Sequence, residues 1–121
     1  MPILSPEEVA WKLYSSAKNG APSRNKEFSL SYEDVLKLVK KGSCAMSGIP
    51  FDMNERPFRG REIPWRASLD RIDNNIGYTA ENIQVVCKIY NTAKYIWTDE
   101  DVMRLAKALS ERSSNGRSDR C

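Results

Sequence analysis

Along the second half of the chain, the alternation of apolar and polar positions changes from strand-like to helix-like. Alternation over residues 68–72 predicts one strand, and the alternating, β-branched stretch 82–87 predicts another. Asn and Gly between them, at 74–77, indicate a tight turn. From 88 to 94 the apolar spacing becomes that of a short helix. Strands this close in sequence leave no room for a parallel crossover, so we predict an antiparallel hairpin with a helix laid across it.

Two helices are predicted before this unit. Ser5-Pro6-Glu7-Glu8 has the form of a capping box with Pro at the first helical position, and the helix it opens runs to about Lys18. A second helix is expected over about 31–39. It ends at Gly42, because a residue without a Cβ suits the position after a helix.

A last helix is predicted from Asp99 to about Arg112, opened by a cap at Thr98. Its apolar stripe consists of Val102, Leu105, Ala106 and Leu109. We expect this stripe to pack on the body of the protein, with a homodimer interface as the alternative. Residues 113–121 are polar and are predicted to form a disordered tail.

The length and composition are those of one domain. The chain has 121 residues, a net charge of +3 and 3 cysteines. An odd cysteine count argues against a secreted disulfide framework, and no apolar run approaches the roughly 20 residues of a membrane span. We therefore expect a cytoplasmic protein with no membrane partner. Residues 1–112 should form a single α+β domain, built from a hairpin and crossing helix at about 67–97 with further α-helices around them.

Two residues of the predicted hairpin unit offer candidate metal ligands. On the first strand Leu69 and Ile72 tend toward a core, and Asp70 lies between them; Asn91 falls on the crossing helix. Carboxylate and amide oxygens suit Mg²⁺, Mn²⁺ or Ca²⁺, and the helix could bring the two side chains into one coordination sphere. The alternative is structural: Asp70 would pair with Arg71 or Arg66 at a surface, and Asn91 would cap a local backbone group.

This stretch resembles the HNH-type, or ββα-metal, nuclease superfamily. The resemblance rests on Asp70-Arg71 on the first strand, Asn82 before the second, Asn91 nine residues later and Lys94 three residues beyond. It implies that Asp70 and Asn91 hold one divalent cation, Mg²⁺ or Mn²⁺. It also implies that Asn82 braces the loop through backbone hydrogen bonds and that the substrate is DNA.

The chain departs from that family at the position of its general base. The family usually has His there, whereas this chain has Arg71 and contains no histidine. Arg cannot accept a proton near neutral pH because its pKa exceeds about 12. We therefore interpret Arg71 as a phosphate clamp or an electrostatic partner of the transition state. The base would be Tyr78, a metal-bound hydroxide or the substrate phosphate; Tyr78 starts from a pKa of about 10 and could equally be a packing aromatic.

A second departure concerns zinc. Many members of the family flank this unit with two Cys-x-x-Cys pairs, but here the first pair is Cys44 with Ser47 and the second is Cys87 with Tyr90. Two thiols are too few for the four ligands of a structural zinc, so we expect none. We expect the two cysteines to lie near each other as small buried hydrophobic residues.

A basic segment with interleaved aromatic residues leads into the first strand. Arg side chains can bind phosphates or guanine edges, and aromatic rings can stack on bases. We therefore expect nucleic-acid contacts from this segment, with a solvated surface loop as the alternative, and we expect Lys94 to contact the nucleic acid as well. The candidate residues are Arg56, Arg59, Arg61, Trp65, Arg66 and Lys94.

The function expected from these features is metal-dependent endonuclease cleavage of duplex or branched DNA at a one-metal site. Asp70 and Asn91 would bind the metal, and Arg71, Tyr78 and Asn82 would serve the reaction. Two alternatives remain open. One is a catalytically inactive DNA-binding domain on the same scaffold, and the other is a protein-interaction module that uses the last helix.

Overall fold

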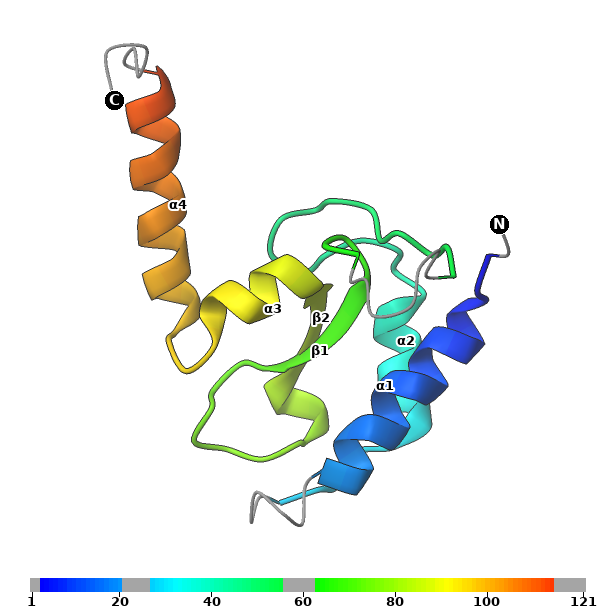
Figure 1. The fold of residues 1–121 in the computed structure, drawn as a ribbon. Helices are drawn as coiled ribbons and strands as arrows, with labels where there is room; N and C mark the ends of the chain where they lie inside the picture. Colours follow the sequence, from blue (N-terminus) through cyan, green and yellow to red (C-terminus); the bar gives the residue numbers. More distant parts are fainter. Residues whose placement is uncertain (1–2, 21–26, 56–62, 115–121) are drawn as a thin grey trace.

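The computed structural model describes residues 3–20, 27–55 and 63–114 (Figure 1). Within these ranges the chain forms four α-helices, one short 3-10 helix and a two-stranded sheet, which confirms the predicted α+β class. The elements are α1 (Pro6–Gly20), α2 (Tyr32–Val39), β1 (Ala67–Arg71), η2 (Ala80–Asn82), β2 (Ile83–Cys87), α3 (Lys88–Lys94) and α4 (Asp99–Ser114). None of the described helices is long and apolar enough to cross a membrane.

The two strands form the predicted antiparallel hairpin, and α3 follows β2 without a break. Pairing runs from Ala67 opposite Cys87 to Arg71 opposite Ile83. In Figure 1, α1 and α2 lie together on one side of the hairpin and α3 crosses its other side. The hairpin is therefore covered by helices on both faces, which explains why β2 buries Val85 and Val86 although they are neighbours in sequence.

Capping boxes fix the starts of α1 and α2. The Ser5 amide donates to Glu8 Oε1 at 2.8 Å and the Glu8 amide donates to Ser5 Oγ at 3.1 Å. Ser31 and Asp34 make the same exchange at 3.0 and 3.1 Å. The first of these caps was predicted from the sequence, and the second lies at the predicted start of α2. α1 presents small residues to the hairpin and α2, since Ala10 and Ala17 are its buried positions.

The apolar positions next to the hairpin depart from the sequence prediction in two places. Leu69 packs against the core, but Ile72 is 44 % exposed because β1 ends at Arg71 and the chain turns away. On α3 the apolar Ile89 is 49 % exposed, and Lys94 is the buried residue. The helix thus turns a polar side toward the hairpin, and this side holds the candidate site.

The prediction that α4 packs on the body is wrong. No residue of α4 is buried, and Leu105 and Leu109 are each 55 % exposed. Figure 1 shows α4 leaving the body beside α3 and projecting away from it. Ser113 and Ser114 of the predicted tail continue this helix, and residues 115–121 lie outside the described residues.

The loop between β1 and η2 is pinned to an earlier segment by main-chain hydrogen bonds. The Tyr78 amide donates to Glu27 O at 2.8 Å, and the Ser29 amide donates to Tyr78 O at 3.0 Å. Gly77 is the point of closest approach, because a Cβ at this position would lie 2.2 Å from Glu27 O and 2.6 Å from Glu27 N. Only glycine fits without moving one of the two backbones.

We expect Gly77→Ala to lower the free energy of unfolding by about 3 kcal/mol, the upper part of the usual range for overpacking, because both neighbouring atoms are backbone. Chemical denaturation would measure this loss. Gly48→Ala is the control, since Gly48 has φ +75° but no atom within 4 Å of an added Cβ. Its cost should be about 1 kcal/mol, that of a left-handed backbone alone. Equal losses in the two variants would contradict the close-approach argument.

Candidate active site on β1 and α3

The candidate site lies between β1 and the polar side of α3. Alternation along β1 directs Ser68 and Asp70 to the same face of the hairpin. From α3, Asn91 Nδ2 donates to Ser68 Oγ at 2.7 Å and to Leu69 O at 3.1 Å. Lys94, one helical turn further on, reaches Asp70. The structure thus places both predicted metal ligands in the same β1–α3 contact.

A buried ion pair occupies the centre of this contact. Lys94 Nζ donates to Asp70 Oδ2 at 2.8 Å, and the two side chains are 0 % and 5 % exposed. Lys94 also donates to Arg71 O at 2.8 Å and to Ile72 O at 3.1 Å. These acceptors match its three N–H donors. The expectation that Lys94 contacts nucleic acid is therefore wrong, because its ammonium is enclosed by the end of β1. The alternative pairing of Asp70 with Arg71 is wrong as well.

A second acid, which the sequence analysis did not single out, joins this pair. Asp99, the first residue of α4, has Oδ1 3.4 Å from Lys94 Nζ and accepts a hydrogen bond from the Tyr90 hydroxyl at 2.5 Å. Gln84 Nε2 donates to Asp70 Oδ2 at 2.8 Å and lies 3.4 Å from both Asp99 oxygens. Burial, followed by the hydrogen bond to Asp99, raises the pKa of the Tyr90 hydroxyl far above its usual value. Tyr90 therefore remains a donor.

The contacts of Asp70 and Asn91 leave one oxygen on each side chain. Asp70 accepts both of its hydrogen bonds at Oδ2 and Asn91 donates both of its own from Nδ2, so in the described residues neither Oδ1 is engaged. No group of three or more His, Cys, Asp or Glu side chains in the described ranges could hold a metal. A carboxylate and an amide oxygen do fit a divalent cation that keeps several waters, as Mg²⁺ commonly does.

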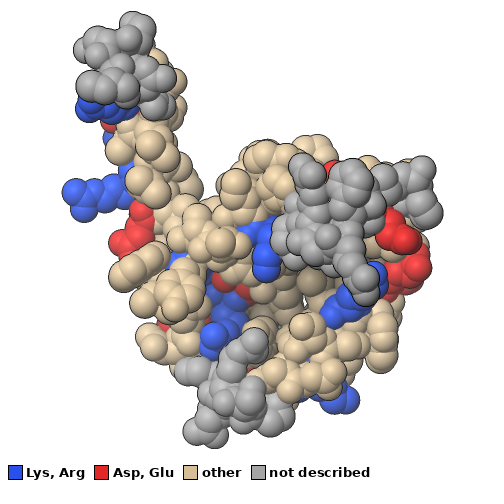
Figure 2. Space-filling model, in the orientation of Figure 1, with Lys and Arg blue, Asp and Glu red and all other residues tan. Residues whose placement is uncertain are grey.

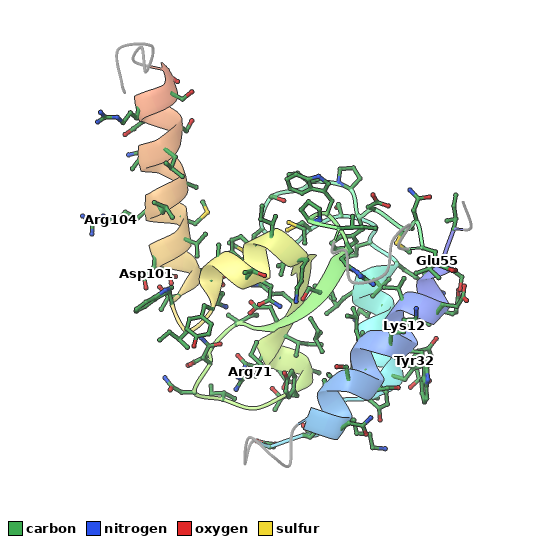
Figure 3. All side chains as sticks on the ribbon, viewed as in Figure 1. Lys12, Tyr32, Glu55, Arg71, Asp101 and Arg104 are labelled. Carbon is green, nitrogen blue, oxygen red and sulfur yellow. The ribbon has the colours of Figure 1, made fainter. Side chains whose placement is uncertain are left out.

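Arg71 and Tyr78 lie at the loop end of the hairpin, where Figure 3 labels Arg71. Arg71 Nη1 donates to Asn74 O at 2.9 Å and to Ile76 O at 3.2 Å, and its guanidinium carbon lies 5.4 Å from the centre of the Tyr78 ring. The Tyr78 ring also meets Phe28, with ring centres 5.8 Å apart, and the residue is 8 % exposed. The Tyr78 ring thus packs against Phe28, next to a permanent cation.

Asn82 binds the same loop from its other side. Its Oδ1 accepts from the Asp73 amide at 2.9 Å, and its Nδ2 donates to the carbonyls of Asp73, Ile76 and Gly77 at 3.0 to 3.2 Å. One buried side chain thus satisfies four backbone groups between the strands. The backbone bracing implied by the family resemblance is present in the structure.

The two cysteines at the positions of the family's Cys-x-x-Cys pairs are neighbours in the core. Cys44 and Cys87 are free and each 2 % exposed. Burial raises the pKa of the Cys44 thiol, but hydrogen bonds from Ser47 and from the Cys87 backbone outweigh burial and lower it. Burial, with the neighbouring Cys44 thiol, raises the pKa of Cys87. The prediction that the two residues lie together as small buried side chains is confirmed.

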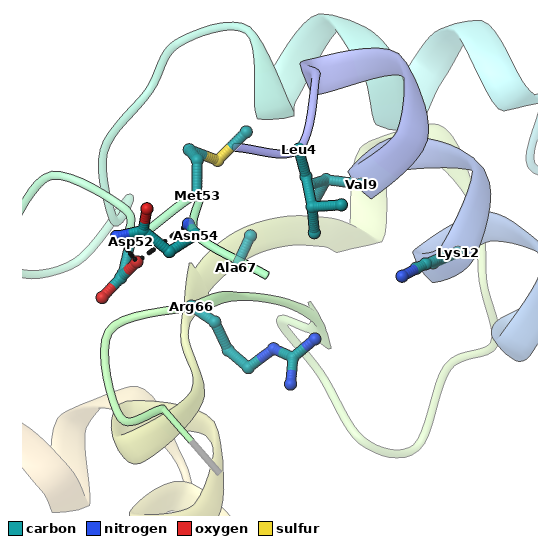
Figure 4. Close-up of a pocket in the computed structure, with 8 residues that line it drawn as sticks. All are labelled: Leu4, Val9, Lys12, Asp52, Met53, Asn54, Arg66 and Ala67. Atoms are coloured by element: carbon teal, nitrogen blue, oxygen red, sulfur yellow. Dashed lines mark hydrogen bonds between the residues drawn. The ribbon is translucent and has the colours of Figure 1, made fainter. Parts of the chain in front are cut away.

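The predicted DNA-binding segment is described only at its end. Arg56, Arg59 and Arg61 lie outside the described residues, while Trp65 is 40 % exposed. Arg66 lines a small cavity of about 30 Å³ between α1 and the start of β1, together with Lys12 (Figure 4). In the view of Figure 2, Lys and Arg side chains lie across the face between α3 and α1.

Comparison with solved structures assigns the fold. The structure of the rare-cutting HNH restriction endonuclease PacI, described for an extraordinary mechanism of DNA perturbation, matches with a TM-score of 0.63 over 90 % of this chain and 81 % of that chain, at 22 % sequence identity. The chain has an HNH-type fold. The similarity at this identity concerns the fold alone.

Sequence comparison adds one relative without a described activity. An uncharacterized 29.0 kDa protein from the dda-modA intergenic region of Enterobacteria phage T4 is 35 % identical over 83 residues, which is 69 % of this chain and 31 % of the relative. The chain thus spans about a third of the length of that protein. No protein-family model matches the sequence.

We expect Lys94→Met to lower the free energy of unfolding by about 3–5 kcal/mol, because it leaves the buried Asp70 carboxylate without its cation. Lys107→Met is the matched control. The Lys107 side chain is 76 % exposed and pairs with Glu111 within α4, at 3.7 Å, so its loss should cost no more than about 0.5 kcal/mol. Urea titrations of the two variants would measure both values, and a small loss for Lys94→Met would show that the ion pair does not hold α3 on β1.

Proposed function

We propose that this protein is a metal-dependent endonuclease that hydrolyses DNA phosphodiester bonds at a one-metal site. The observation that supports this most directly is that Asp70 and Asn91 belong to the same β1–α3 contact and that, in the described residues, Oδ1 of each is unengaged. The HNH-type fold, which a restriction endonuclease shares, also supports a nuclease function. Asp70 and Asn91 would hold Mg²⁺ or Mn²⁺, which would polarise the scissile phosphate and stabilise the leaving 3′ oxygen.

In this proposal Arg71 is an electrostatic partner of the phosphate. Two loop carbonyls hold Nη1, so the guanidinium is fixed in place while Nη2 and Nε keep N–H groups for phosphoryl oxygens. A fixed cation that needs no rearrangement stabilises developing charge effectively. Asn82 serves the reaction by holding the loop on which these carbonyls lie.

Tyr78 is our candidate to orient or deprotonate the attacking water. It lies beside Arg71, whose guanidinium carbon is 5.4 Å from the centre of its ring. DNA contacts are proposed for Arg56, Arg59, Arg61, Trp65 and Arg66, of which the described pair lies at the entry to β1.

A catalytically inactive DNA-binding domain on the same scaffold is the second candidate. The observation in its favour is the 2.8 Å ion pair, because Lys94 already balances the charge of Asp70. In that case Arg71 and the basic segment would bind DNA without cleaving it.

Nicking of a supercoiled plasmid in Mg²⁺ or Mn²⁺ separates the two candidates. We expect the wild-type protein to nick, and Asp70→Asn and Asn91→Ala each to lower the rate at least about a hundredfold, since each removes a metal ligand. DNA affinity at a fixed salt concentration should be nearly unchanged in both variants. Thr92→Ala is the control, because Thr92 lies beside Asn91 on the exposed side of α3. Strong duplex binding by a wild-type protein that never nicks would establish the inactive binder instead.

We also propose that the protein is a homodimer in which α4 packs against α4 of a second copy. An isolated helix of 16 residues is marginal in water, and this one buries no residue in the single chain. The first turn is acidic (Asp99, Glu100, Asp101) and the last turn carries Arg112, while Lys107 and Glu111 pair with each other. Two antiparallel α4 helices would therefore place opposite charges together at both ends, with their dipoles opposed.

Sedimentation velocity over a series of protein concentrations tests the dimer. We expect wild type to associate and the double variant Leu105→Glu with Leu109→Glu to remain a monomer, because charges replace the centre of the apolar stripe while Glu keeps helix propensity. Arg104→Glu is the control, since Figure 3 shows Arg104 pointing away from the body on the same helix. A wild-type monomer at every concentration would refute the homodimer.

A further inference from the structure

The buried cluster around Lys94 contains more negative charge than the ion pair requires. Lys94 has a hydrogen-bonded carboxylate partner in Asp70, at 2.8 Å, and a second carboxylate in Asp99, at 3.4 Å. The Asp99 side chain is 16 % exposed, so it is largely withdrawn from water. Withdrawing a second carboxylate from water costs free energy, and Lys94 and Asp70 already balance each other's charge. The position of Asp99 beside them therefore needs an explanation.

Asp99 is also held firmly in place. The Tyr90 hydroxyl donates to its Oδ1 at 2.5 Å, and Gln84 Nε2 lies between the two acids, 2.8 Å from Asp70 and 3.4 Å from Asp99. Tyr90 comes from α3 and Gln84 from β2, so two elements fix a residue that belongs to α4. Such an arrangement goes beyond what a helix start needs, since α4 already has a capping box between Thr98 and Asp101.

The charge of the cluster decides how well it attracts a cation. Asp70 and Lys94 alone would form a neutral pair, and a divalent ion approaching Asp70 would be repelled by an ammonium within the same contact. With Asp99 included, the formal charge is that of two carboxylates and one ammonium, which is negative. Lys94 then has a second acceptor that can take a larger share of its charge while Asp70 binds the ion.

We propose that Asp99 is a positioning residue of the metal site, which shares the Lys94 ammonium with Asp70 and so leaves Asp70 able to bind a divalent cation. The inference rests on the proposed metal site, and it assigns a role to a residue outside the HNH-like motif. It also connects the first residue of the projecting helix α4 to the chemistry on β1.

Binding of Mn²⁺ to the intact protein without DNA tests the proposal, measured by the electron paramagnetic resonance signal of the free ion. Asp99→Asn keeps the shape and an acceptor for Tyr90 but removes the charge, and we expect it to weaken Mn²⁺ binding by about tenfold to a hundredfold. Asp99→Glu should restore binding to within about threefold of wild type. Glu100→Gln is the matched control, because it removes the same charge from the exposed neighbouring position and should leave binding unchanged.

The kinetic counterpart is a shift in the metal requirement. With plasmid as substrate, Asp99→Asn should raise the half-saturating Mn²⁺ concentration by the same factor and leave the rate at saturating Mn²⁺ close to that of wild type. A merely structural role would instead lower the melting temperature without moving this concentration.

The outcomes separate this inference from the proposed function. If Asp70→Asn abolishes Mn²⁺ binding while Asp99→Asn binds like wild type, the role of Asp99 is refuted and the metal site stands. If wild type binds no Mn²⁺ and nicks no plasmid, the proposed function and the role of Asp99 are both refuted. Should Asp99→Asn not fold, Tyr90→Phe takes its place: it releases Asp99 without changing its charge, and it should weaken Mn²⁺ binding severalfold, so unchanged binding would refute the inference.

Discussion

The fold around the candidate site depends on one buried ammonium. Lys94 donates to a carboxylate and to two backbone carbonyls where β1 ends, and this fixes the end of α3 against the hairpin. The apolar residues of α3 contribute less, since Ile89 is half exposed and only Tyr90 packs partly buried against the core. A short helix of seven residues has little stability of its own, so its orientation across the hairpin comes from Lys94 and from the amide of Asn91. The residues that hold the helix are therefore the same ones that shape the site.

Much of this architecture could be predicted from the sequence. The alternation over 68–72 and 82–87 located both strands to within a residue, because strand periodicity is a local property. The capping box at Ser5 located the start of the first helix for the same reason. The tight turn expected at 74–77 is instead part of a longer connection, which runs from the end of β1 at Arg71 through η2 to Ile83. The bracing role of Asn82 followed from the family resemblance and is present in four hydrogen bonds.

The errors arose where tertiary contacts override residue type. Lys94 was expected to contact nucleic acid, but no local pattern shows that it lies under the end of β1. The stripe on α4 has the spacing of a buried face, but periodicity does not state which surface covers it. Asp99 was assigned to a helix start because acids are favoured there, and this preference hid its contacts with Tyr90 and Lys94.

The contacts of Asp99 also connect the projecting helix α4 to the candidate metal site. Asp99 belongs to α4, whose remaining length leaves the body, and it touches the pair that includes the proposed metal ligand Asp70. A partner that binds α4 would therefore bind the helix whose first residue, Asp99, lies beside Lys94. Because Asp99 is fixed by hydrogen bonds from α3 and near contacts from β2, a change in the direction of α4 could reach Asp70 only by breaking or stretching those bonds. Tyr90 and Gln84 thus determine whether the projecting helix and the site behave as one unit, and their geometry favours a rigid connection over a flexible one.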